Sequence, residues 1–159
     1  MGHDDGFLGA VGSMFDMSYD GSRHIWHRHS LVGASCMLFA VLGSPVFLAR
    51  GHGAMAALMV VTSVCSFWAD YVHVEEPDHV VHQIDRVVAF VSVACLSYSS
   101  LFILGLPFMY CFCALAGAVL LFLLSRSRKR RSEWVICHTL WHVVPLLLIF
   151  TPGMLGLYP

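Results

Sequence analysis

Residues 106–124 read LPFMYCFCALAGAVLLFLL, an apolar stretch without a charged side chain. An α-helix rises about 1.5 Å per residue, so a stretch of this length reaches across a hydrocarbon core of about 30 Å with some tilt. A helix on the surface of a soluble protein would instead carry a polar face. The stretch is therefore predicted to be a transmembrane helix.

Four other runs have a similar length and apolarity. They cover residues 31–49, 53–72, 82–104 and 134–151. The chain of 159 residues is 58% hydrophobic and 12% charged, with a mean hydropathy of +0.74, which leaves too little polar surface to cover a soluble globule. We therefore expect an all-α, polytopic integral membrane protein. Residues 31–159 would form a bundle of about five transmembrane helices, and residues 1–30 a polar, interfacial segment.

The connections between the runs predict how the chain is oriented. Three polar segments are long, residues 1–30, 73–81 and 125–133, whereas the turns after residues 49 and 104 are short. If five helices alternate across the bilayer, the three long segments share one face, which holds every Lys and Arg except Arg50. The positive-inside rule then puts the Arg-rich loop 126–131 on the cytoplasmic or matrix side. The endoplasmic reticulum or Golgi and the mitochondrial inner membrane both stay open.

Composition also bears on partners and packing. The basic residues fall in short segments and form no stripe that could follow a phosphate backbone, so membrane lipids and not nucleic acid are the expected partners. All six cysteines fall inside apolar runs, where they are expected to act as small packing residues. Small residues such as Gly33, Ala56 and Gly117 are expected to allow close approach of helices.

Two histidines near the start of the last run give the strongest functional pattern. His138 and His142 are four residues apart, so they project from one helical face and can bind one metal ion together. Each histidine could instead form a hydrogen bond with a neighbouring helix or lie at the interface, where Trp141 would also fit. The spacing alone leaves both interpretations open.

Polar residues at the facing ends of the second and third runs join this pattern. Ser66, Asp70 and His73 follow spacings of four and three, so they share a helical face, and Asp85 lies near the start of the third run. The topology brings both elements to the same depth and side of the membrane as the histidine pair. There Asp85 could orient or deprotonate a reacting water, and Ser66 could donate a hydrogen bond to an oxyanion.

This convergence predicts a zinc site. A catalytic zinc ion has three protein ligands and an open position for water, which it makes a nucleophile near neutral pH. His138 and His142 would be two of the ligands. Asp70 or His73 would be the third.

The pattern resembles the CREST superfamily of membrane hydrolases, which includes alkaline ceramidases, progestin and adipoQ receptors and GPI-remodelling lipases. In that superfamily a Ser-x-x-x-His ends one helix, an Asp opens the next, and a His-x-x-x-His lies on the final helix. Here Ser66 matches the serine, Asp85 the aspartate, and His138 with His142 the final pair. The resemblance implies zinc-dependent hydrolysis of an amide or ester bond in a lipid, with a ceramidase-like activity and access for the acyl chain through the bilayer.

The chain also departs from that pattern. Asp70 stands where the superfamily has the histidine four residues after the serine, and the nearest histidine is His73. The superfamily typically has seven helices, and the resemblance covers about residues 55–150 of a five-helix chain. These departures leave open whether the site is active.

Two other functions remain possible from the sequence. A short, apolar chain with one polar face also suits a non-catalytic accessory subunit of a large membrane complex, for example a respiratory or photosynthetic one. The ten histidines, including His24, His27 and His29, raise haem binding and electron transfer as a third possibility. Axial haem ligation generally needs two histidines that face each other, and a pair four apart on one helix fits a single metal ion better.

Overall fold

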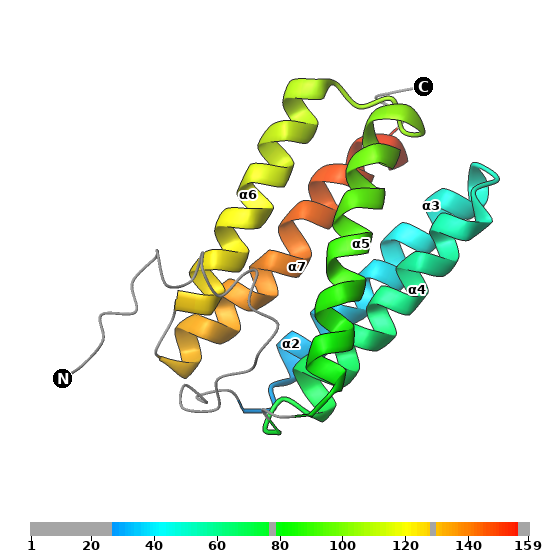
Figure 1. Cartoon of the computed structure of the whole chain (residues 1–159). Helices are drawn as coiled ribbons and strands as arrows, with labels where there is room; N and C mark the ends of the chain where they lie inside the picture. Colours follow the sequence, from blue (N-terminus) through cyan, green and yellow to red (C-terminus); the bar gives the residue numbers. More distant parts are fainter. Residues whose placement is uncertain (1–26, 77–78, 128–129, 156–159) are drawn as a thin grey trace.

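The structure is a computed structural model that describes residues 27–76, 79–127 and 130–155. These residues contain five helical spans. The first span consists of α2 (Ser30–Leu38), the π-helical stretch η2 (Phe39–Gly43) and α3 (Ser44–Ala49). The second consists of α4 (Gly53–Phe67) and the π-helical stretch η3 (Trp68–Val72). The other three are single helices, α5 (Val81–Phe102), α6 (Phe108–Ser127) and α7 (Arg131–Met154) (Figure 1). Each span has a stretch of 20 to 22 residues that is long and apolar enough to cross a membrane. The prediction of an all-α membrane protein with five transmembrane helices is therefore confirmed.

The helix ends differ from the predicted runs by a few residues. The third helix ends at Phe102 and the fourth continues to Ser127, while the last begins at Arg131. Hydropathy marks the part of a helix that suits lipid, but the backbone stays helical through polar residues at the interface. Residues 1–26, most of the predicted N-terminal segment, lie outside the described residues.

The connections lie as the topology predicts, with the long ones at one end of the bundle. In Figure 1 the start of α2, the α4–α5 connection and the α6–α7 connection are at the lower end, which we call the polar end. The two short turns at the other end each contain a glycine with positive φ, Gly51 at +77° and Gly105 at +67°. Arg50 donates a hydrogen bond from Nη1 to the carbonyl oxygen of Ile103 at 3.0 Å, so it links one short turn to the other.

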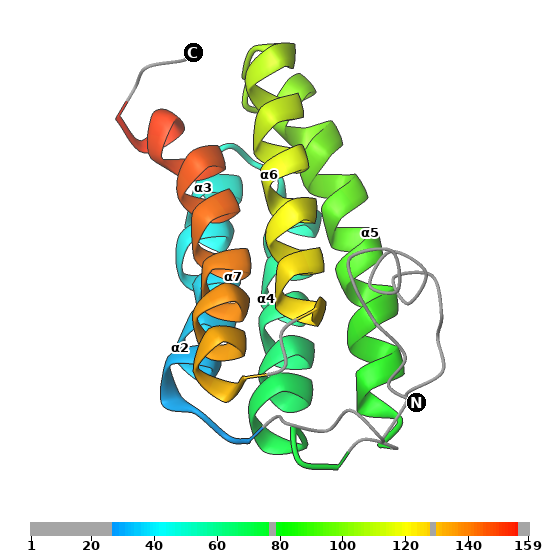
Figure 2. The same cartoon turned by 90° about the vertical axis from the view of Figure 1, so that its left-hand side faces the viewer.

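The helices pack as two pairs joined by the first span. Helix α5 packs mainly on α4, and α6 packs mainly on α7. Helix α2 contacts both α4 and α7 and so connects the pairs, an arrangement that Figures 1 and 2 show from two sides. The contact between α5 and α6 is less extensive. This leaves room inside the bundle between the two pairs.

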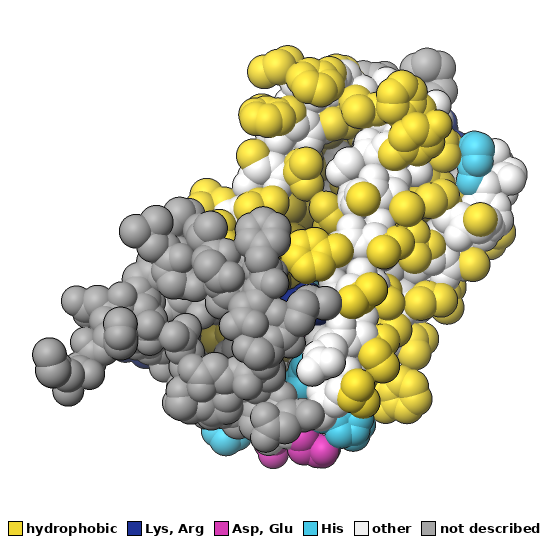
Figure 3. All heavy atoms as spheres, viewed as in Figure 1, with side chains coloured by type: hydrophobic (Ala, Val, Ile, Leu, Met, Phe, Trp, Pro, Cys, Tyr) yellow, Lys and Arg dark blue, Asp and Glu magenta, His cyan; other side chains and the backbone are white. Residues whose placement is uncertain are grey.

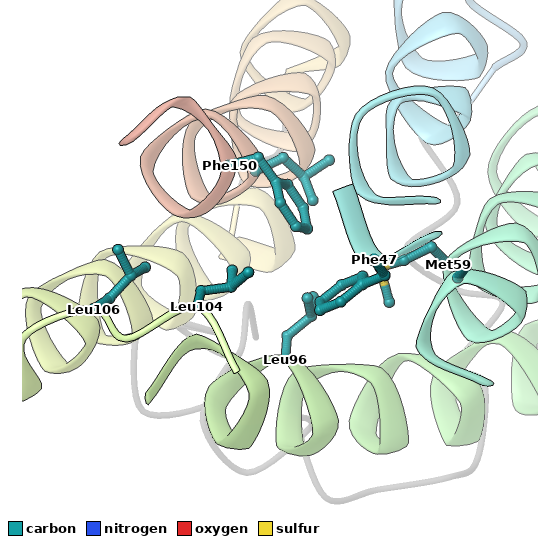
Figure 4. Packing of buried hydrophobic residues seen from close by; sticks show 8 residues of the cluster. Phe47, Met59, Leu96, Leu104, Leu106 and Phe150 are labelled. Atoms are coloured by element: carbon teal, nitrogen blue, oxygen red, sulfur yellow. The ribbon is translucent and has the colours of Figure 1, made fainter. Parts of the chain in front are cut away.

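An apolar core closes the half of the bundle away from the polar end. Phe47, Met59, Leu96 and Phe150 come from four different helices and are buried together (Figure 4). The rings of Phe47 and Phe150 meet edge to face, with centroids 5.7 Å apart. Such packing stabilises helix association in lipid, where burial from water supplies little. The half nearer the polar end contains the polar side chains described below.

The outer surface is typical of a protein in contact with lipid. Figure 3 shows hydrophobic side chains over the faces of α5 and α6, while the visible acidic side chains lie at the lower edge with histidine side chains beside them. Large exposed hydrophobic residues occur on every span, for example Val41, Val61, Phe102, Phe112 and Leu147. A soluble protein rarely exposes so much contiguous apolar surface.

Candidate functional site

A cavity of about 180 Å³ lies inside the bundle and reaches the polar end. Five of the six predicted site residues line it: Ser66, Asp70, Asp85, His138 and His142. They come from the second, third and fifth spans. Most of the remaining wall is apolar and comes from α5, α6 and α7. The structure therefore brings these five residues to one place and leaves His73 outside.

Asp70, in η3, is the centre of the cluster. Its Oδ2 atom lies 2.9 Å from Nε2 of His138 and 3.8 Å from Nε2 of His142. The Asp70 side chain is only 17% exposed and the His142 side chain 2%. Nitrogen and oxygen ligands of a tetrahedral zinc ion lie about 3.3 Å from each other, so both distances are within about half an ångström of such a site.

The second ring nitrogen of His142, Nδ1, contacts Ser35. Ser35 on α2 donates its hydroxyl proton to the carbonyl oxygen of Val32 at 2.7 Å. With that hydroxyl proton directed to Val32, the Ser35 Oγ atom can accept from Nδ1–H of His142, which is 2.9 Å away. In this tautomer Nε2 of His142 presents its lone pair on the side of the Asp70 carboxylate, 3.8 Å away. A cation between the two would interact favourably with both.

His138 has a similar pair of partners. Its Nδ1 atom lies 3.0 Å from Oγ of Ser125 on α6. Without a metal ion, His138 can donate from Nε2–H to Asp70 while Nδ1 accepts from the serine. A hydroxyl both donates and accepts, so Ser125 can also accept from Nδ1–H when Nε2 binds a cation. Such a partner on the far nitrogen is usual for histidines that bind metals.

Ser66 and Asp85 form a second pair in the same cavity. The Ser66 hydroxyl, on α4, donates to Oδ1 of Asp85, on α5, at 2.7 Å. Ser66 is buried and Asp85 partly buried. The predicted donor and the predicted base are thus in direct contact, and the proton of Ser66 is directed to the Asp85 carboxylate.

His73 lies elsewhere because the helical path of the second span ends at Val72. Its ring stacks on that of His79, with centroids 3.8 Å apart, and its Nδ1 atom is 3.2 Å from Oε1 of Glu76. His82, at the start of α5, donates from Nε2 to the carbonyl oxygens of His73 and Glu76 at 3.0 and 3.1 Å. Of the two predicted third ligands, only Asp70 is beside the histidine pair.

Three further residues join the cluster without having been predicted. Ser35 and Ser125 hold the histidines, and Cys36 was expected only to fill space. The Cys36 Sγ atom lies 4.0 Å from Oδ2 of Asp70 and 3.8 Å from Nδ1 of His142. No sequence motif marks any of the three, because each becomes significant only through the helix that faces it.

The histidines that precede the first helix have other roles where they are described. His24 lies outside the described residues. His27 lies 3.4 Å from Oε1 of Glu75, and Nδ1 of His29 accepts from the backbone N–H of Leu31 at the start of α2. None of the metal-binding groups found among the described residues contains these two histidines. They give the haem interpretation no support.

The Asp70 carboxylate thus faces Nε2 of both His138 and His142 in a buried cavity, with a serine and a second carboxylate alongside. This arrangement can hold a divalent cation, or share a proton within a buried network. Comparison with known proteins adds nothing to these two possibilities: no protein-family model, curated protein or solved structure matches the chain.

Proposed function

We propose that this chain is a membrane-embedded, zinc-dependent hydrolase that acts on an amide or ester bond in a lipid, with a ceramidase-like activity. The observation that supports the proposal most is the meeting of Asp70, His138 and His142 with the Ser66–Asp85 pair at one cavity. A metal site, a base and a hydrogen-bond donor are the groups that such hydrolysis uses.

The residues at this site fit zinc. Imidazole and carboxylate are common zinc ligands, and Nε2 of both histidines faces the Asp70 carboxylate. His138, His142 and Asp70 would hold the ion. When bound, zinc would polarise the carbonyl group of the substrate and activate a water molecule.

Ser66 and Asp85 would act beside the metal. Asp85 accepts a hydrogen bond from the Ser66 hydroxyl at 2.7 Å, so its carboxylate is available to a hydroxyl or a water molecule in the cavity. It would take the proton of the attacking water. Ser66 would then turn its hydroxyl toward the oxygen of the scissile group, where negative charge develops.

The shape of the cavity favours a lipid substrate. Phe90 on α5 and Leu115 on α6 line the cavity and are 38% and 37% exposed. These two helices contact each other less extensively than α6 and α7 do, and we propose that the cavity opens to lipid between them. An acyl chain could enter there while the polar linkage lies at Asp70.

We further propose that the polar end faces the cytoplasm, or the matrix if the protein is mitochondrial. Among the described residues, Arg28, Arg126, Arg130 and Arg131 lie at or near this end and Arg50 lies at the other. This distribution follows the positive-inside rule. A cysteine introduced at Arg131 should react with an impermeant maleimide from that side only.

Metal content of the purified protein tests the proposed activity first. Wild-type protein should carry near-stoichiometric zinc by elemental mass spectrometry, and His138→Ala/His142→Ala should carry none. Asp85→Asn should keep its zinc but lose hydrolysis of amide- and ester-linked lipids by about 100-fold or more, as expected for loss of a general base. Wild-type protein without zinc would contradict the proposal and favour a non-catalytic subunit of a membrane complex.

A further inference from the structure

Cys36 occupies a place in the cluster that packing alone does not require. It lies in α2, is fully buried, and faces both Asp70 and His142. One ligand atom from each of Cys36, Asp70 and His142 lies within 4.8 Å of the other two. His138 does not belong to this compact group, although its Nε2 atom touches Oδ2 of Asp70.

The spacing of these three residues suits a metal ion. With zinc–sulfur bonds of about 2.3 Å and zinc–nitrogen or zinc–oxygen bonds of about 2.0 Å, neighbouring ligands in a tetrahedron lie about 3.3 to 3.6 Å apart. Sγ of Cys36 lies 4.0 Å from Oδ2 of Asp70, and Oδ2 lies 3.8 Å from Nε2 of His142. The ligand atoms of the three residues all lie within 4.8 Å of one another. A small contraction of the group around an ion would be sufficient.

We propose that Cys36 is a ligand of the metal ion at this site, together with Asp70 and His142. The inference rests on the proposed metal site but changes its ligand set. His138 then lies next to the ion, hydrogen-bonded to Asp70, and the fourth coordination position faces the cavity with Ser66 and Asp85.

Charge gives an independent reason for a thiolate here. Zinc with one carboxylate and two neutral imidazoles carries a net positive charge, which is costly within a membrane. Zinc with the Asp70 carboxylate, the Cys36 thiolate and neutral His142 carries none. As the ion binds, the thiol loses its proton to solvent and the sulfur–metal bond replaces the sulfur–hydrogen bond, with no change of oxidation state.

Cobalt substitution tests this assignment. Cobalt(II) reports sulfur ligation by a thiolate-to-metal charge-transfer absorption in the near ultraviolet, whereas zinc is silent. We expect the absorption in wild-type protein and its loss in Cys36→Ser, with zinc affinity lowered by more than about tenfold. Cys113→Ser is the matched control, because Cys113 is exposed on α6; it should keep both. Helical circular dichroism and gel filtration should show that each variant is folded.

Single histidine variants separate this inference from the proposed function. His142→Ala should lose the metal, whereas His138→Ala should keep cobalt and its charge-transfer absorption. Cobalt that binds to wild-type protein without that absorption, or an absorption that survives in Cys36→Ser, would overturn the role of Cys36 and leave the metal site intact. Folded wild-type protein that binds neither cobalt nor zinc would overturn both.

Discussion

Tyr71 packs directly on Gly33: a Cβ atom at residue 33 would meet ring atom Cδ2 of Tyr71 at 2.7 Å and Cγ at 2.9 Å. The contact joins α2 to η3, the π-helical turn that carries Asp70. A side chain at residue 33 would therefore have to displace Tyr71, the neighbour of Asp70 in η3.

Gly33→Ala should destabilise the protein by about 1 to 3 kcal/mol, the usual cost of inserting a methyl group into a packed region. The neighbours are the rigid rings of Tyr71 and Phe67, which cannot move aside as a flexible chain would. The free energy of unfolding, measured by denaturant titration in detergent, gives the value. Combining Gly33→Ala with Tyr71→Ala should recover part of the loss.

Gly117→Ala is the control for this substitution. A Cβ atom there would meet nothing within 4 Å, and alanine favours a helix over glycine by about 1 kcal/mol. Its stability should equal or exceed that of wild type. Equal losses in Gly33→Ala and Gly117→Ala would show that the Tyr71 contact is not the cause.

The spans were predictable from sequence because the backbone must satisfy its own hydrogen bonds in lipid. A long apolar run does so by forming an α-helix that crosses the membrane. Both Gly33 and Gly117 were expected where helices approach closely. The structure has a close contact at Gly33, but no atom lies within 4 Å of a Cβ placed at Gly117. Apolar composition cannot distinguish the two glycines, since both faces of such a helix are hydrophobic. The rotation of each helix about its axis therefore had to come from the structure.

The residues of the candidate site were likewise predictable only in part, because the sequence does not show which sides of the helices face each other. The spacing of His138 and His142 placed them on one face, but nothing in the sequence of α2 indicated that Ser35 and Cys36 face them. His73 was expected to continue the face of Asp70, and the end of the helical path at Val72 prevents this. Helical spacing predicts that residues share a face only where the helix is continuous.

Glu75 should contribute to stability in a pH-dependent way. The backbone N–H of Arg28 donates to Oε1 at 3.2 Å, and with His27 nearby this lowers the pKa of the Glu75 carboxyl from its usual 4.5. A lowered pKa in the folded state means that the contribution is complete above the unfolded value and is lost as the pH falls through the folded value. Glu75→Gln should therefore lower the thermal unfolding temperature at pH 7 and have less effect near pH 3.

Glu133→Gln is the matched control for that experiment. Glu133 lies at the same end of the bundle, and its carboxylate faces Arg130 one turn away at 3.8 Å. A surface pair of this kind contributes little, so its removal should leave the unfolding temperature near that of wild type. A Glu75→Gln curve that coincides with that of wild type over the whole pH range would show that the Arg28 contact does not stabilise the fold.

The hydrogen bond between Ser35 and His142 should matter for metal binding although Ser35 itself is not a proposed ligand. Ser35 Oγ can accept from Nδ1–H of His142, and this tautomer leaves Nε2 free for a cation. Partners of this kind typically contribute 10- to 100-fold to metal affinity. The effect separates a metal site from a merely structural hydrogen bond, which would alter stability alone.

Ser35→Ala should therefore lower zinc affinity by about 10- to 100-fold, measured by competition with a chelator of known affinity. The substitution leaves Nδ1–H of His142 without its acceptor and removes the preference for one tautomer. Ser97→Ala is the control, because Ser97 lines the same cavity but donates its hydroxyl to Val93 within its own helix at 2.8 Å. If both variants bind zinc as wild type does, Ser35 does not orient a ligand. If zinc affinity falls equally in both variants, the loss comes from general damage to the cavity, because Ser35 contacts His142 whereas Ser97 donates to Val93.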